Sequence, residues 1–103
     1  VRDIKFGWEC YGIVKEDGSL YMGGNNSGGQ LGDGTTEDRY DAPVKIMDNV
    51  RTVIMGAFKV NGAITRKGEL YIWGGGHHLK PVKVMDNVLA ASIASVLDDQ
   101  SVV

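Results

Sequence analysis

The chain has 103 residues, with 11 Lys and Arg against 13 Asp and Glu and a formal net charge of -2, which suits one domain of ordinary size. Because the basic residues are scattered, the sequence lacks the positive patch that nonspecific binding to nucleic acid or anionic membranes needs. No apolar run approaches the ~18 residues of a membrane span, and no secretory signal is expected. The single cysteine, Cys10, excludes an intrachain disulfide and predicts a small buried side chain. These features do not assign the chain to a cellular compartment.

Fifteen glycines and only two prolines, set among Val, Ile, Leu, Tyr and Trp, predict short strands joined by tight turns. Apolar and polar residues alternate with a period of two, so we expect half-buried strands such as the one that carries Ile4 and Phe6. In chain order the predicted strands cover residues 1–6, 11–15, 19–23, 43–47, 51–55, 61–65, 69–73, 81–85, 89–94 and 100–103. The stretch after Val88 could equally support a short helix, because it is rich in Ala and Leu.

Two kinds of turn separate these strands. Asp17 with Gly18, and Lys67 with Gly68, lie between two strand-like runs, where glycine supplies the positive φ of a hairpin turn. The Asp-Asn pairs at residues 48–49 and 86–87 are expected to form further turns of this kind, since both residue types tolerate a left-handed backbone.

The sequence repeats itself with a period of about 50 residues. The run DGSLYMGG at Asp17 recurs as KGELYIWG at Lys67, an offset of 50. The run PVKIMDNV recurs as PVKVMDNV with an offset of 38, so the second copy is shortened by 12 residues between Gly74 and Pro81. Such self-similarity is typical of architectures in which each repeat is one supersecondary unit.

The opening run VRDIKFG matches VRTVIMG, which begins at Val50. One extra residue falls between Gly56 and Gly62 of the second copy, where a β-bulge would absorb it most easily. A third partial copy begins at Val88.

A glycine-rich stretch, GNNSGGQLGDGT at residues 24–35, follows the third predicted strand. Its glycines allow positive φ and close backbone approach, so the chain can leave a strand and return over its sheet. Leu31 is expected to fill a gap between neighbouring sheets, and Gln30 to satisfy backbone groups in the turn. The stretch lacks the Lys and Ser/Thr of a phosphate-binding loop, which argues against nucleotide hydrolysis. We therefore predict a connector between two sheets.

These motifs together resemble the regulator of chromosome condensation repeat, bacterial members in particular, over essentially the whole chain. The resemblance implies an all-β fold of antiparallel four-stranded blades of a β-propeller, seven-bladed in the family, with about two blades in residues 1–103. It also implies a binding platform. The sequence departs from the family pattern at Gly23, where Trp is usual, at Cys10 and Lys59, where His is usual, and at GGHHLK in the second copy.

Two clusters of possible metal ligands are weak. His77 and His78 are adjacent, and neighbouring residues of a strand point to opposite faces, so a polar turn with exposed imidazoles is preferred to a zinc site. Four acidic residues of one loop could in principle gather Ca²⁺, but their spacing differs from the known calcium loop, so a solvated acidic loop is preferred. These four are Asp33, Glu37, Asp38 and Asp41.

No nucleophile and base pair, paired carboxylates or cofactor motif appears, so neither enzymatic activity nor a cofactor or metal is expected. Aromatic and Arg side chains carry most of the energy of protein interfaces. The residues expected at a partner-binding surface are Trp8, Tyr11, Arg39, Tyr40, His77 and His78, with Phe58 as a further candidate.

About two repeats cannot close a ring, and repeat architectures generally need three or more units. We therefore expect a segment of a longer propeller or an assembly with another protein or with further copies, a homo-oligomer included. The leading functional hypothesis is a non-catalytic protein–protein interaction module. The alternatives are a guanine-nucleotide exchange platform for a small GTPase and a structural or carbohydrate-binding cell-surface module.

Overall fold

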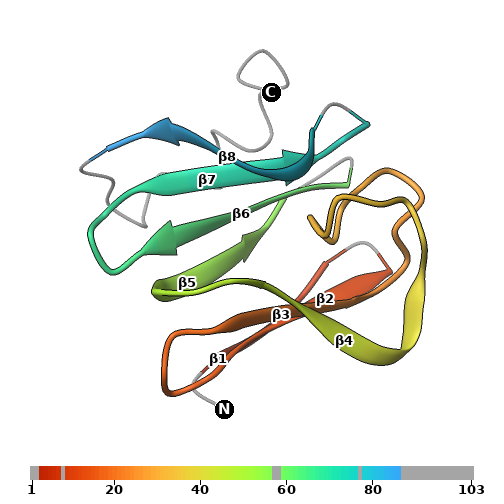
Figure 1. Ribbon diagram of the computed structural model, residues 1–103, viewed down its shortest axis with the longest axis horizontal. Helices are drawn as coiled ribbons and strands as arrows, with labels where there is room; N and C mark the ends of the chain where they lie inside the picture. Colours follow the sequence, from red (N-terminus) through yellow and green to blue (C-terminus); the bar gives the residue numbers. More distant parts are fainter. Residues whose placement is uncertain (1–2, 8, 57–58, 77, 87–103) are drawn as a thin grey trace.

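The computed structural model describes residues 3–7, 9–56, 59–76 and 78–86, which form two four-stranded antiparallel sheets (Figure 1). The first sheet contains β1 (Asp3–Phe6), β2 (Cys10–Val14), β3 (Leu20–Gly24) and β4 (Arg39–Met47). The second contains β5 (Val50–Met55), β6 (Val60–Thr65), β7 (Leu70–Gly74) and β8 (His78–Met85). In both, consecutive strands are neighbours, so each repeat of the sequence forms one sheet. The described residues contain no helix with the length and hydropathy of a membrane span.

The predicted hairpin turns are confirmed. Gly18 and Gly68 have φ of 88° and 82°, and each donates its N–H to the carbonyl of the residue three positions earlier. Asn49 also has a positive φ, 63°, but its turn joins β4 to β5 and therefore links the two sheets instead of closing a hairpin. The expected turn at residues 86–87, the predicted strands at 89–94 and 100–103 and the possible helix after Val88 lie wholly or partly outside the described residues.

The fourth strand of each sheet begins earlier than predicted. The sequence predicts strands from residues 43 and 81, whereas β4 begins at Arg39 and β8 at His78. Both extensions follow from pairing at the far end of the third strand, where Gly24 pairs with Arg39 and Gly74 with His78. A register shift separates this pair from the rest of each ladder, so the extra residues bulge out of the pairing. In the first sheet the bulge places residues 40–43 opposite Gly23.

The extra residue of the second copy is not a β-bulge, as the sequence had suggested. The pairing of Met55 with Asn61 continues the register of β5 and β6 without a shift at this point. Gly7 donates its N–H to the carbonyl of Cys10 in the first sheet, while Gly56 donates to Val60 in the second, both at 2.9 Å. The additional residue therefore lengthens the turn, which costs less than disturbing a paired strand.

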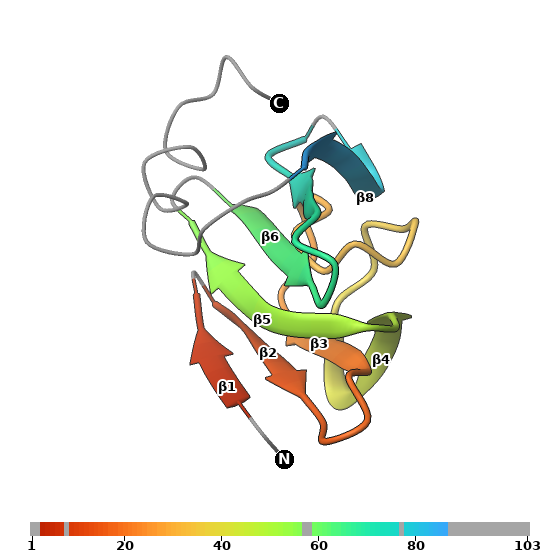
Figure 2. The ribbon, with the colours of Figure 1, turned by 90° about the vertical axis from the view of Figure 1, so that its left-hand side faces the viewer.

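The main core lies between the sheets, with β5 against β1 and β2 (Figure 2). Because paired residues of neighbouring strands share a face, Val14, Leu20 and Met22 line one side of the first sheet. They form one fully buried cluster that also holds side chains of the second sheet, Val53 and Trp73 among them. A second buried cluster covers the opposite face of the second sheet and contains Val60, Ile64, Leu70 and Ile72.

The other face of the first sheet is largely uncovered. Ile4 and Phe6 were expected to form the buried face of a half-buried strand, but 47% and 78% of their surfaces are exposed. They pair with Ile13 and Tyr11, and Tyr21 follows across the sheet, so all five residues share one face. We call this the open face, defined by Ile4, Phe6, Tyr11, Ile13 and Tyr21.

Candidate functional site

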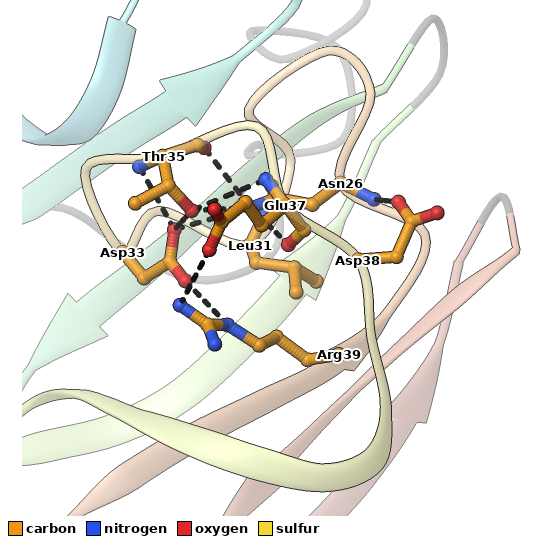
Figure 3. Close-up of polar contacts among 7 residues, drawn as sticks. All are labelled: Asn26, Leu31, Asp33, Thr35, Glu37, Asp38 and Arg39. Atoms are coloured by element: carbon orange, nitrogen blue, oxygen red, sulfur yellow. Dashed lines mark hydrogen bonds and ion pairs between the residues drawn. The ribbon is translucent and has the colours of Figure 1, made fainter.

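The loop between β3 and β4, residues 25–38, is held in shape by one buried amide. Asn26 is fully buried, and its Nδ2 donates to Asp33 Oδ1 at 3.1 Å and to the carbonyls of Thr35 and Glu37 at 2.9 and 3.0 Å (Figure 3). Its Oδ1 accepts from the backbone N–H of Leu31 at 2.9 Å. Because one side chain binds both arms of the loop, Asn26 fixes where the loop turns back. We call residues 25–38 the connector loop.

Asp33 fixes the second half of the connector loop. Its Oδ1 accepts from the backbone N–H and the hydroxyl of Thr35 at 3.0 and 2.8 Å, and its Oδ2 accepts from Arg39 Nε at 3.0 Å. Burial of the carboxylate, only 5% exposed, favours the neutral form, but the hydrogen bonds from Thr35, Arg39 and Asn26 outweigh it and lower the pKa of Asp33. Asp33 is thus an ionised structural anchor for Arg39 at the start of β4.

The other acidic side chains of the loop bind groups of the loop or of the adjoining Arg39. Asp38 accepts the backbone N–H of Asn26 at 2.7 Å, and Glu37 lies 3.8 Å from Arg39 Nη2. The described residues hold no group of three or more His, Cys, Asp or Glu side chains that could bind a metal ion.

The connector loop reaches the second sheet through a main-chain carbonyl. The oxygen of Gln30 accepts from Trp73 Nε1 at 2.7 Å and from Asn61 Nδ2 at 2.8 Å, and all three residues are buried. Leu31, as predicted, is fully buried in the core between the sheets. The Gln30 side chain accepts the N–H of Gly28 at 2.8 Å, which confirms its expected role in the turn. The prediction of a connector between sheets is therefore confirmed.

Main-chain hydrogen bonds fasten the rest of the loop to the second sheet. Gly34 donates to the carbonyl of Leu79 at 2.8 Å, and Gly76 donates to the carbonyl of Gly28 at 2.9 Å. Gly32 has a φ of 80°, and a Cβ there would lie 2.9 Å from the Trp73 ring, so both its backbone and its contact require glycine. We call the receiving residues on the second sheet the loop seat: Asn61, Trp73, Leu79 and Lys80.

The two positions at which the family usually has His lie beside this contact. Lys59 donates from Nζ to the hydroxyl of Ser27 at 2.8 Å. Cys10 is buried, as predicted, and Asn61 Nδ2 lies 3.6 Å from its sulfur. Burial raises the pKa of the Cys10 thiol, because the hydrogen bond from Asn61 only partly offsets the loss of solvation. Both residues support the packing of the loop.

The predicted partner-binding residues fall into two groups. Arg39 and Tyr40 lie next to each other at the start of β4, where residues 38–42 line a shallow pocket of about 250 Å³. Tyr40 is 66% exposed. Tyr11 lies in β2 on the open face, and the register places residues 40–43 opposite Gly23, the partner of Tyr11. The structure therefore brings Tyr11 close to the segment that carries Arg39 and Tyr40.

His78 belongs to the second sheet. It is half-buried and pairs with Gly74 at the start of β8, so the prediction of a turn with an exposed imidazole is wrong at this position. The physical reason is the short link after β7, which brings His78 straight back into the ladder. Trp8, Phe58 and His77 lie outside the described residues.

Sequence reasoning missed two features of this surface. Ile4 and Phe6 are exposed, although their alternation resembles that of any half-buried strand. The ring of Tyr11 covers Gly23 so closely that a Cβ at Gly23 would collide with it. A signal existed in the repeat, because the matching residues of the second copy, Asn61 and Trp73, differ from Tyr11 and Gly23 as a pair.

Comparisons with known proteins agree with this architecture. Residues 17–58 match the family model of the Regulator of chromosome condensation (RCC1) repeat. No curated protein matches the chain significantly.

Solved structures show the same fold. A crystal structure of human WBSCR16 matches with 19% identity and a TM-score of 0.69 over 81% of this chain and 25% of that chain. Prp20p from Saccharomyces cerevisiae, described with its binding properties to Gsp1p and histones, matches with 20% identity and a TM-score of 0.69 over 82% of this chain and 25% of that chain. Yeast RCC1 (Prp20) with bound Kap60 gives 19% identity and a TM-score of 0.66 over 84% of this chain and 26% of that chain.

The chain therefore spans about a quarter of the length of these structures. At these identities the similarity shows the fold: the two sheets are antiparallel four-stranded blades of a β-propeller.

Proposed function

We propose that this chain, which carries repeats of the regulator of chromosome condensation family, is a non-catalytic module that binds protein through the open face and the adjoining segment at residues 39–42. Both belong to the first sheet, and together they hold the exposed aromatic and Arg side chains of the predicted surface.

The observation that carries this proposal is that two equivalent sheet faces differ in solvent exposure. Val53 and Met55 of β5 occupy the positions that Ile4 and Phe6 occupy in β1, since each pair aligns with matching residues of the second strand. Val53 is fully buried and Met55 packs against the core, whereas Ile4 and Phe6 are exposed. A face that can be covered by another sheet is thus open on the first sheet, as expected of an interaction surface.

The chemistry of this surface suits a protein partner. Phe6, Tyr11 and Tyr40 offer large rigid side chains that lose little entropy on binding, and Arg39 is already held by Asp33. The carboxylates of Glu37 and Asp33 beside Arg39 reduce its attraction for a phosphate backbone. Aromatic contact with one directed cation therefore favours protein over nucleic acid.

The partners described for proteins of this fold are consistent with that class. Prp20p is described with binding properties to Gsp1p and histones, and yeast RCC1 has been crystallised with Kap60. These partners are proteins, but this chain covers only about a quarter of those molecules. Among the described residues, nothing specifically favours the nucleotide-exchange or carbohydrate alternatives, and exchange assays and glycan arrays would detect each directly.

Photo-crosslinking tests the proposal. A photoreactive residue at position 6 or 40 is expected to capture proteins from a lysate of the source cells, and Phe6→Ser is expected to abolish capture from position 40. Met85→Ser is a matched control, because Met85 is also an exposed apolar residue, at 40%, but lies at the end of β8 in the second sheet. Equal capture by the Phe6→Ser and Met85→Ser proteins would contradict the proposal.

A further inference from the structure

The pocket at the start of β4 is small and open to solvent. Its volume of about 250 Å³ lies below the roughly 300–1,000 Å³ of pockets that take a small molecule, so its size suits one side chain of a partner. Two of its lining residues, Tyr40 and Asp41, are exposed, and neither side chain makes a hydrogen bond or ion pair within the described part of the chain. An aromatic ring and a carboxylate are thus both available to a ligand.

The positive charge beside this pocket is already neutralised. Arg39 Nε lies 3.0 Å from Asp33 Oδ2, and Arg39 Nη2 lies 3.8 Å from Glu37 Oε2 (Figure 3). Asp38 and Asp41, by contrast, form no ion pair with a cation of the residues that the structure describes. Arg39 therefore offers little attraction to an anion, and the two aspartates offer unpaired negative charge to a cation.

The chain concentrates its negative charge in this region. Residues 33–41 hold four carboxylates and one guanidinium, a net charge of -3, whereas the whole chain has a net charge of -2, so the other residues together carry +1. The field of such a segment attracts a cation and repels a phosphate or another acidic surface. The exposed ring of Tyr40 adds to this preference, because the face of an aromatic ring also attracts cations.

The fold itself does not require a carboxylate at the start of this strand. β4 and β8 begin at the same point of their ladders, since Gly24 pairs with Arg39 and Gly74 with His78. The first three residues of β4 read RYD, and those of β8 read HLK. The second sheet forms the same register shift without an acidic residue, so strand pairing does not explain Asp41. Recognition of a cation does explain an exposed ring and carboxylate side by side.

From these observations, and resting on the proposed function, we infer that the pocket at residues 38–42 receives an arginine side chain from a basic segment of the protein partner. The guanidinium stacks on the Tyr40 ring and donates to the carboxylates of Asp41 and Asp38. Asp38 Oδ1 already accepts a backbone N–H of the connector loop at 2.7 Å, so its other oxygen is the available one. Arginine fits better than lysine, because its planar, weakly hydrated group can stack on a ring and bind a carboxylate at the same time.

The open face determines what flanks this arginine. Residues 40–43 lie opposite Gly23, which the ring of Tyr11 covers, and Phe6 pairs with Tyr11 on the same face. The pocket therefore adjoins an apolar surface, and a segment that crosses both carries apolar residues next to its arginine. A Leu-Arg-Leu-Arg-Leu peptide, blocked at both ends, is the probe that follows from this arrangement.

Binding of the probe peptide to the 103-residue chain can be followed residue by residue by NMR. We expect the amide signals of residues 38–42 to shift. A peptide with citrulline in place of arginine keeps the shape and loses the charge, and it is expected to bind at least about fivefold more weakly. A lysine peptide is expected to fall between the two. An arginine peptide that leaves residues 38–42 unshifted, or a citrulline or lysine peptide that binds equally well, would overturn the inference.

Substitutions in the pocket test its two chemical parts. Asp41→Asn and Tyr40→Leu are each expected to weaken binding of the arginine peptide about two- to fivefold, and Asp41→Asn to leave the citrulline peptide unchanged. Asp48→Asn is the matched control, because it removes the same charge from a side chain that is 73% exposed and lies just past the other end of β4. It is expected to leave the affinity unchanged. Equal losses for Asp41→Asn and Asp48→Asn would mean that the peptide follows only the overall charge, which contradicts the inference.

Capture from a lysate separates this inference from the proposed function. With the photoreactive residue at position 6 the pocket is intact, and Asp41→Asn is expected to lower capture about two- to fivefold. Capture that Asp41→Asn leaves unchanged overturns the inference and leaves the proposed function standing. Absence of capture from both position 6 and position 40 contradicts the proposed function, and the peptide titration then decides the arginine pocket alone.

Discussion

In the first sheet the chain leaves β3 at Gly24 and returns to β4 at Arg39 through a connector loop with its own buried hydrogen-bond network, whereas in the second it passes from Gly74 to His78. The long loop spans the gap to the neighbouring sheet, and the short link leaves its own sheet without such an arm. The same strand pairing, with a register shift at the same place, therefore occurs both in a blade whose long loop binds the neighbouring sheet and in a blade whose third and fourth strands are joined by a short link. The hydrogen bonds between these blades depend on the connector loop and the loop seat, and not on the strand pairing that both sheets share.

The strongest test of this comparison is Asn26→Ala. We expect it to lower the free energy of unfolding by about 3 kcal/mol, because it leaves several buried backbone and carboxylate groups of the loop without their partner. Urea denaturation would measure the change. Asn25→Ala, in a half-exposed neighbour, is expected to cost less than about 1 kcal/mol, and equal losses would show that Asn26 does not organise the loop.

The loop seat can be tested against its counterpart. Trp73→Phe removes a buried donor to the carbonyl of Gln30 and part of a packed ring, so we expect a loss of about 2 kcal/mol. Tyr11→Phe in the 103-residue chain removes a hydroxyl without a partner among the described residues and is expected to change stability by less than about 0.5 kcal/mol. Similar losses in thermal or urea unfolding would contradict the role of Trp73 as the donor that holds the connector loop.

The connector loop should also make the chain sensitive to acid. The pKa of Asp33 is lowered in the folded protein, so its ionised form adds stability above the unfolded pKa, and that stability is lost as the pH falls through the folded pKa. Denaturation followed from pH 6 to pH 2 is expected to show a weaker loss for Asp33→Asn, which starts from a lower stability at pH 6. An unchanged pH profile would mean that Asp33 does not titrate with folding.

The smallest expected change in stability concerns a surface ion pair that occurs in both sheets. Lys45 pairs with Asp48 in the first sheet and Lys83 with Asp86 in the second, where Glu69 is an additional partner. Lys83 lies 2.8 Å from Asp86 and 3.1 Å from Glu69, and these carboxylates raise its pKa to about 12. Its contribution is present below the unfolded pKa of 10.5 and is lost as the pH rises through about 12. Because Lys83 is on the surface, Lys83→Met is expected to change stability only slightly, and Lys45→Met, with Asp48 as its single ion-pair partner in the described chain, even less. Equal effects of the two substitutions in urea denaturation would show that Glu69 contributes nothing.

The sequence predicts much of this fold because it contains two comparable copies. The offsets between copies define the strands, the hairpin turns at Gly18 and Gly68 and the connecting role of Leu31. The starts of β4 and β8 are missed because they depend on where the chain re-enters the ladder beside Gly24 and Gly74, which is set by the path of the loop and has no local signal. Local propensity also cannot place one inserted residue in a turn or in a strand.

The candidate surface is predicted in part. Arg39 and Tyr40 follow from their residue types, but the exposure of Phe6 depends on which face another sheet covers. Tyr11 and Gly23 are neighbours on adjacent strands but lie twelve residues apart in the chain, so their contact has no local sequence signal. The comparison with the equivalent pair Asn61 and Trp73 shows that the two positions differ together between the copies. The absence of a side chain at Gly23, where the family usually has Trp, is thus explained by the Tyr11 ring that occupies the space.

The acceptor that joins the two blades is the main-chain oxygen of Gln30, an atom that every amino acid supplies. Substitution at position 30 therefore retains this acceptor and removes only the hydrogen bonds of the Gln30 side chain within the loop, while substitution at Asn61 or Trp73 removes a donor outright. At this joint the requirement for particular hydrogen-bonding side chains therefore falls on the receiving blade, while the loop depends on Asn26 for its shape and on Gly32 for its close approach to Trp73.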